Sequence, residues 1–336
     1  MRITRKELNK TYNQQTESFL DVDKKDHGIE QLKNNVYKTG KQNKQTAAAQ
    51  INHPNLTFPT FYVLISEIDA LSLYNLLNFR NAAAIQICSR FLRDDVMGKK
   101  VSIRPVTNEQ QYPVLKWMFT TGWQEDGLSN QFDQILDIAT GILIKKYNDQ
   151  STLPTIVHEI FERNRKGLFI HDLIWNFYQA RNLDALKLVA QYLRSSDPQD
   201  VKLACAILHF TPEREQDVHG DPQNKYDSYL SWLQENQPYL YFSGESLQYS
   251  SEPDAFKVNL NAKYLAKKES AAAQPLNSFE QKKLGQFRQI QDHDRKLLAK
   301  YSCRMHDHNP QQWNQWMRAD IQQQLQTAKG QEGTTP

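Results

Sequence analysis

The chain has 336 residues, of which 39% are hydrophobic and 24% charged, and its formal net charge is +3. This length suffices for two or three domains, and the hydrophobic fraction excludes a chain that is disordered throughout. Glycine is scarce, at 12 residues, which disfavours a glycine-rich nucleotide-binding or turn-rich all-β design and favours helices.

The positive charge is concentrated at the start of the chain. Residues 1–46 hold ten Lys or Arg and six Asp or Glu, a balance of +4, so the remainder carries −1. Residues 1–54 are rich in Lys, Gln, Asn and Thr and poor in apolar residues, which predicts a polar, basic tail that is flexible or only transiently helical. Association with nucleic acid through this tail is an alternative function, but a nucleic-acid-binding domain normally shows a concentrated basic face on its folded body.

Helical patterns fill residues 55–210, which we predict to be a helical domain. Two helical runs cover residues 60–80 and 82–97, and a long connection, with a short strand at 101–103, covers residues 98–113. From Gly127 an amphipathic helix follows, because apolar residues recur at helical spacing. The stripe consists of Phe132, Ile135, Leu136, Ala139 and Leu143.

Four further helices are expected between residues 152 and 210. Leu186, Val189, Ala190 and Leu193 share a face in the third, and Val201, Ala204, Cys205 and Leu208 share one in the fourth. Asp197 before a proline is a helix N-cap signal. The helix pairs recur at an offset of about 30 residues, which predicts stacked pairs at residues 153–210. The second pair, "DALKLVAQYLRSSDPQDVKLACAIL", resembles a HEAT-type helical repeat in its rhythm.

The C-terminal part, residues 224–328, is an aromatic-rich helical region in this interpretation. It starts with a short helix at 226–236, has a small β or irregular insertion near residues 238–260, and ends with two helices at 278–302 and 309–328. Residues 329–336 are expected to be disordered. The order of "YLYF", "GES" and "AKYL", followed by "LLAKYS" and "WNQWM", resembles a group of uncharacterised helical proteins from spore-forming bacteria. That resemblance implies no known activity.

The stretch "YLYFSGESLQ" raises the question of a catalytic serine. A nucleophile elbow requires Gly-x-Ser-x-Gly, because the strained turn leaves no room for side chains beside the serine. Here Gln248 stands where the second glycine would have to follow Ser246. We therefore interpret the segment as a turn or hairpin without catalytic function.

Metal-binding and phosphate-binding patterns are incomplete. His158 and Glu162 occupy the two ligand positions of a zincin helix, which requires histidine at both, so a surface ion pair is the favoured interpretation. Cys303, His306 and His308, with His293 or Asp294 upstream, lack the second ligand pair of a structural zinc site. Glu67 and Asp69 have no Glu-x-x-His partners for di-iron chemistry. No phosphate-binding glycine motif occurs, and we expect neither a metal nor a cofactor.

The three cysteines, Cys88, Cys205 and Cys303, are widely spaced, which is typical of reduced thiols in a cytoplasmic protein. The N-terminus is charged from its second residue and lacks the apolar region of a signal peptide. The most apolar window, residues 58–77, carries Glu67 and Asp69 at its centre, so no membrane span is expected.

Aromatic residues are the most conspicuous feature of the composition, with 15 Tyr, 15 Phe and 6 Trp. Aromatic side chains are favoured both in cores and at protein interfaces. Core packing is the first interpretation of the C-terminal cluster, and contact with a partner protein is the second. The residues of this candidate partner surface are Trp232, Tyr239, Tyr241, Phe242, Trp313 and Trp316.

These observations predict a mainly α protein: a HEAT-like helical repeat or an irregular helical bundle, with the small insertion near residues 238–260. Its expected function is protein–protein interaction, as a non-enzymatic scaffold, because helical stacks offer extended surfaces. One alternative is an enzyme with a dispersed, metal-dependent polar site around His158, Glu162 and His171. The other is nucleic-acid association through the tail. The sequence leaves the oligomeric state and the partner open.

Overall fold

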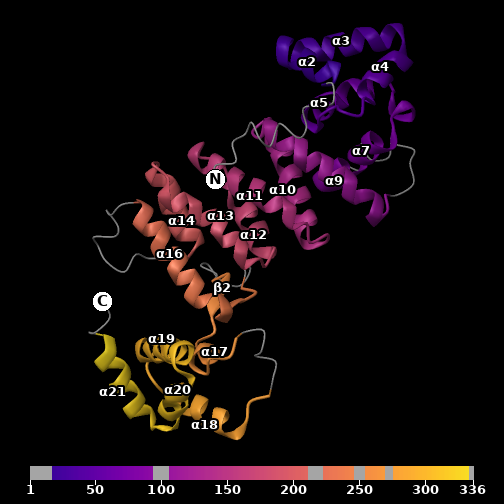
Figure 1. The fold of residues 1–336 in the computed structure, drawn as a ribbon. Coiled ribbons are helices and arrows are strands. Elements are labelled where there is room, and N and C mark those ends of the chain that lie inside the picture. The colour runs from indigo at the N-terminus through magenta and orange to yellow at the C-terminus, as the bar shows by residue number, and fades with distance from the viewer. Residues whose placement is uncertain (1–16, 94–105, 211–221, 246–253, 269–274, 333–336) are drawn as a thin grey trace. The chain divides into compact units, whose positions relative to one another are not determined.

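The structure, a computed structural model, describes residues 17–93, 106–210, 222–245, 254–268 and 275–332. These residues are mainly α-helical, with one small sheet among them, as the sequence predicted (Figure 1). The chain divides into two compact units, Met1–Ala180 and Arg181–Pro336. This division falls inside residues 153–210, so the stacking of the two helix pairs, and with it the HEAT-like repeat, stays a prediction.

Three helices occupy the segment where a flexible tail was expected: α2 (Phe19–His27), α3 (Ile29–Gln42) and α4 (Lys44–Ile51). The prediction was wrong for residues 17–54, because the few apolar residues there are spaced to form one buried face. Leu32, Val36 and Gly40 follow one another every four residues along α3, and all are buried. A Cβ on Gly40 would lie 2.4 Å from Leu71 Cδ1, so a larger residue here would force the Leu71 side chain to shift. Residues 1–16 lie outside the described residues.

The apolar stretch after Pro54 forms short helices instead of the continuous run expected at residues 60–80. Ser72 has a φ of +53°, in the left-handed region, where a right-handed helix cannot continue. Phe58, Phe61 and Leu64 are fully buried nonetheless. The expected strand at 101–103 lies outside the described residues. The elements are α5 (Phe58–Val63), α6 (Ile65–Ala70), the 3-10 turn η1 (Tyr74–Leu76) and α7 (Phe79–Leu92).

The helix α9 (Asn108–Gly122) begins inside the stretch 98–113 that was expected to be a connection. Its start is a capping box: the Thr107 hydroxyl accepts from the Gln110 backbone N–H, and the Gln110 side chain accepts from the Thr107 N–H. The prediction of a connection over the whole of 98–113 was wrong, because the Thr-x-x-Gln pattern at 107–110 signals the start of a helix.

The last helices of the first unit form the frame of the site described below. The predicted stripe of α10 is confirmed, because all five of its residues are buried. α10 packs against both α9 and α12. The elements are the 3-10 turns η2 (Trp123–Glu125) and η3 (Gln150–Thr152), and the helices α10 (Asn130–Lys145), α11 (Leu153–Arg165) and α12 (His171–Gln179).

The second unit begins with short helical elements. The predicted face of Leu186, Val189, Ala190 and Leu193 is buried, which confirms the stripe. Asp197 caps α14 as predicted, because its side chain accepts from the Gln199 backbone N–H at 2.9 Å. The elements are η4 (Leu183–Ala185), α13 (Leu186–Ala190), η5 (Gln191–Arg194), α14 (Pro198–Ile207) and α16 (Pro222–Asn236).

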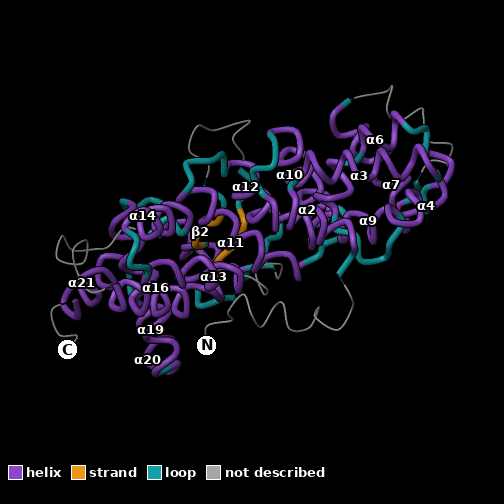
Figure 2. Tube along the Cα trace, turned by 90° about the horizontal axis from the view of Figure 1, so that it is seen from above, coloured by secondary structure: helices purple, strands orange, loops and turns teal. Residues whose placement is uncertain are grey.

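The insertion near residues 238–260 contains the sheet. After the turn η6 (Gln237–Tyr239), β1 (Leu240–Phe242) pairs antiparallel with β2 (Phe256–Val258), and α17 (Leu260–Tyr264) follows. Figure 2 shows these two strands in orange among the purple helices. The stretch "YLYFSGESLQ" thus contributes β1, whose partner β2 lies beyond it in the expected insertion, while Ser246 lies outside the described residues.

The C-terminal region forms four helices where two were expected: α18 (Ser278–Phe287), α19 (Asp292–His308), α20 (Pro310–Arg318) and α21 (Ile321–Glu332). Residues 329–332 belong to α21, so the prediction of disorder was wrong for them, and residues 333–336 lie outside the described part. The core of this region includes a stacked pair of Tyr264 and Phe287, with ring centroids 4.3 Å apart. Within the described residues, no helix has the length and hydropathy that crossing a membrane requires.

Candidate functional site

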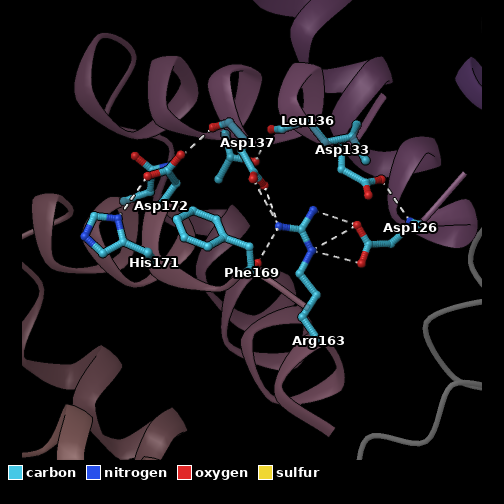
Figure 3. A network of polar contacts seen from close by, with 11 residues as sticks. Asp126, Asp133, Leu136, Asp137, Arg163, Phe169, His171 and Asp172 are labelled. Atoms are coloured by element: carbon cyan, nitrogen blue, oxygen red, sulfur yellow. Dashed lines mark hydrogen bonds and ion pairs between the residues drawn. The ribbon is translucent and has the colours of Figure 1, made fainter. Parts of the chain in front are cut away.

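A buried polar network in the first unit centres on the guanidinium of Arg163, on α11. Its side chain is only 3% exposed and lies between two carboxylates (Figure 3). Nε and Nη2 donate to Asp126 at 2.7–3.1 Å, and Nη1 donates to Asp137 at 2.9 and 3.1 Å. Burial opposes the charge of Arg163, but its hydrogen bonds and ion pairs with the two carboxylates outweigh burial and raise its pKa.

Several elements hold the partners of Arg163 in place. Asp126 lies in the turn before α10, where Gly127 has a φ of +91° and its N–H donates to Asp133 at 2.9 Å. Asp137 lies on α10, and its backbone carbonyl accepts from Asn176 of α12 at 3.1 Å. The network therefore joins the 126–127 turn, α10, α11 and α12.

Arg163 also fixes the loop between α11 and α12. Its Nη1 donates to the Phe169 carbonyl at 3.2 Å, and the Leu168 N–H donates to the Arg163 carbonyl at 2.9 Å. Gly167 supplies the positive φ of +67° that the turn needs. The backbone is thus held, but the side chains of Leu168 and Phe169 are 40% and 66% exposed. Two adjacent large apolar side chains are therefore presented to solvent on a held backbone.

Aromatic rings continue from this loop onto α12. The Phe169 ring centroid lies 5.6 Å from that of His171, which lies 6.4 Å from that of Trp175. Asp172 is beside them, its side chain 60% exposed and its Oδ1 3.1 Å from His171 Nδ1 (Figure 3). We call Leu168, Phe169, His171, Asp172 and Trp175 the α12 aromatic face.

The carboxylates near Arg163 are only partly neutralised. Burial, reinforced by the charge of Asp126, raises the pKa of Glu159 to about 7. Burial likewise raises the pKa of Asp137 to about 6, although Arg163 counteracts it. One guanidinium therefore does not balance the negative charge collected here.

The six aromatic residues predicted as a partner surface are in different environments. Tyr239 and Trp316 are buried, at 4% and 7% exposure, in two separate core clusters. Trp313 is half-buried and donates to Ser302 Oγ at 2.8 Å. Trp232 stacks on Tyr229, Phe242 packs against Phe256, and Tyr241 is 37% exposed. Core packing accounts for the two buried rings, so these do not form an exposed surface.

The residues considered for catalysis or metal binding have other partners. Glu162 pairs with Arg165 at 2.5 Å, and His171 pairs with Asp172. The Cys303 thiol is buried 3.3 Å from the Tyr239 hydroxyl, and His308 Nδ1 lies 2.8 Å from the Arg304 carbonyl. Among the described residues, no group of three or more His, Cys, Asp or Glu side chains is arranged to hold a metal ion.

The basic tail also has a different charge distribution from the one expected. The helical segment 17–54 holds six lysines and five Asp or Glu, a balance of +1. Residues 1–16 therefore carry a net charge of +3, which is most of the +4 counted for residues 1–46. The folded helices α2 to α4 carry no concentrated positive charge of the kind that nucleic-acid binding uses.

The sequence contained a signal for this site that was missed. Ile156, Ile160 and Arg163 are spaced four and three residues apart, which places the arginine on the buried face of α11. A buried arginine requires carboxylate partners. "GLF", after the helix, places two bulky apolar residues outside any helical stripe. The first signal indicates a buried Arg163 and the second an exposed apolar loop, but neither identifies Asp126 and Asp137 as the partners of the arginine.

No family model matches the sequence, and no curated protein and no solved structure is similar to it. The proposals below therefore depend on the structure of this chain alone.

Proposed function

We propose that this chain is a non-enzymatic protein–protein interaction protein, and that its partner binds at the α12 aromatic face. The observation that supports this most is the pair Leu168 and Phe169, which are exposed on a loop whose backbone is bonded to the buried Arg163.

The energetics favour binding at this loop. A phenylalanine side chain buries about 150–250 Å² when it is fully covered. Covering the exposed two thirds of Phe169 would remove roughly 130 Å² from water, worth up to about 3 kcal/mol at ~25 cal/mol per Å². Because the loop is already held by hydrogen bonds, little conformational entropy is lost on binding.

Photocrosslinking at a single residue tests the proposal. Phe169 is replaced by p-benzoylphenylalanine in the full chain, expressed in its native cells, and the same replacement at Phe279 is the control. Phe279, on α18, is 45% exposed and therefore offers a comparable ring at another place. We expect a protein adduct at Phe169 that is absent at Phe279.

Affinity capture with the variant Leu168→Ser/Phe169→Ser completes the test. The crosslinked partner should be lost from this variant and retained by Phe279→Ser. Purified partner and purified chain should then form a complex that the double variant lacks. Equal adducts at both positions, or full retention of the partner by the double variant, would refute the proposal.

A further inference from the structure

Charge around the α12 aromatic face is unbalanced. The charges of neighbouring carboxylates and cations act on Asp133, Asp137 and Glu159, and Glu162 pairs with Arg165, so these charged groups lie close together. The carboxylates are those of Asp126, Asp133, Asp137, Glu159, Glu162 and Asp172, and the cations are Arg163, Arg165 and Lys166. Glu159, with a pKa of about 7, is about half protonated at pH 7, so these six carboxylates and three cations leave an excess between −2 and −3. Such an excess attracts cations over about 8–10 Å at physiological salt.

The aromatic face adds geometry to this charge. The ring of Phe169 is 66% exposed, and the Asp172 side chain, only three residues on, is 60% exposed. A cation over an aromatic face is attracted by its π-electrons. A guanidinium can stack on a ring and bind a carboxylate with two parallel hydrogen bonds, which an ammonium cannot do.

We infer that the partner presents a basic segment to the α12 aromatic face, in which an arginine stacks on Phe169 and pairs with Asp172. This inference rests on the proposed function and specifies its partner. A wholly apolar partner would cover Asp172, which contacts His171 Nδ1 at 3.1 Å, without adding a charge that neutralises it, and the desolvation of a carboxylate is costly. An acidic partner would be repelled by the same excess charge.

Three peptides that differ only at two positions test the inference: acetyl-GLRLRG-amide, the same peptide with neutral citrulline in place of both arginines, and the same peptide with acidic glutamate there. Binding to the full-length chain is measured by calorimetry at 50 and 200 mM salt. We expect one arginine peptide per chain, with at least tenfold tighter binding than either of the other peptides and weaker binding at the higher salt.

Matched variants locate the site. Asp172→Asn should weaken binding of the arginine peptide about tenfold, and Phe169→Leu about two- to fivefold, the range for an exposed cation–π contact. Asp292→Asn, at a carboxylate of similar exposure, and Phe279→Leu, at a less exposed ring, both in the second unit, should leave binding unchanged. Absent binding, equal affinity for the three peptides, or equal effects of Asp172→Asn and Asp292→Asn would overturn the inference.

Two further outcomes separate this inference from its alternatives. If a partner crosslinks at Phe169 but binds Asp172→Asn as tightly as the unchanged chain, the proposed function stands and the basic partner is refuted. If replacing Arg2, Arg5, Lys6 and Lys10 by Gln makes the arginine peptide bind tenfold more tightly, the chain's own basic segment is the occupant. That result would overturn the assignment to another protein.

Discussion

Replacing Glu159 by Gln should stabilise the protein at pH 8 and change its stability little at pH 5. Glu159 is only 9% exposed, and burial, followed by the charge of Asp126, raises its pKa from 4.5 to about 7. A carboxyl whose pKa is higher in the folded than in the unfolded state stabilises the fold when protonated. This contribution is lost as the pH rises from about 4.5 to about 7.

The size of the effect follows from the two pKa values. At about 1.4 kcal/mol per pH unit, a rise from 4.5 to about 7 corresponds to about 3 kcal/mol. Glutamine carries no charge at any pH, so the advantage of Glu159→Gln should grow between pH 5 and pH 7 and then level off. At pH 5 it should be below about 1 kcal/mol, because most of the loss occurs at higher pH.

Denaturant unfolding of the full chain at pH 5, 6, 7 and 8 measures this difference. Glu162→Gln is the control, since Glu162 lies three residues further along α11, is partly exposed and pairs with Arg165. Its effect should stay within about 1 kcal/mol, as for other exposed ion pairs. A pH-independent difference for Glu159→Gln, or a loss of stability at pH 8, would show that a cation neutralises Glu159 in the folded protein.

Three further predictions concern stability, each measured by thermal or denaturant unfolding. Arg163→Met should lower the free energy of unfolding by about 3–5 kcal/mol, because it leaves the buried carboxylates of the network without the guanidinium. A loss below about 1 kcal/mol would contradict the network. Leu193→Ala should lower the free energy of unfolding by about 2–5 kcal/mol, because Leu193 is fully buried. Lys187→Ala, at a side chain that is 49% exposed, should lower it by about 0.5 kcal/mol or less. Equal losses for the two variants would mean that the stripe is misassigned. Asp197→Ala should cost about 1 kcal/mol by removing the N-cap of α14, and Asp197→Ser, which can still accept from the Gln199 N–H, should restore most of it.

Local signals in the sequence predicted local structure well. The stripe of α10, the face of α13 and η5, and the cap at Asp197 each depend on residues within about ten positions of one another, and the structure confirms them. The strand β1 lies in the β-prone aromatic run, and the small insertion expected near residues 238–260 contains it together with β2. Such patterns are read directly from spacing, because each follows from the geometry of one helix or one hairpin.

The start of α9 was a local signal that was missed, but other failures depended on contacts between elements. Residues 17–54 were expected to be flexible because their average composition is polar, yet Leu32, Val36 and Ile51 are buried against other parts of the unit. Composition averages over a segment, whereas burial depends on which few positions face a neighbour. Asp126 and Asp137 are 37 and 26 residues from Arg163 in the chain, so no local pattern identifies them as its partners.

The energetics of the Arg163 network give a reason for its existence. Removing a guanidinium and two carboxylates from water is costly, and apolar side chains of similar volume often stabilise a core as much or more. Stability alone therefore does not account for the network. Apolar side chains, however, cannot donate to the Phe169 carbonyl, and they lack the directional bonds that join the Asp126 turn, α10 and the loop. We infer that Arg163 serves to fix the backbone beneath Leu168 and Phe169, so that two exposed apolar side chains keep one geometry before a partner arrives.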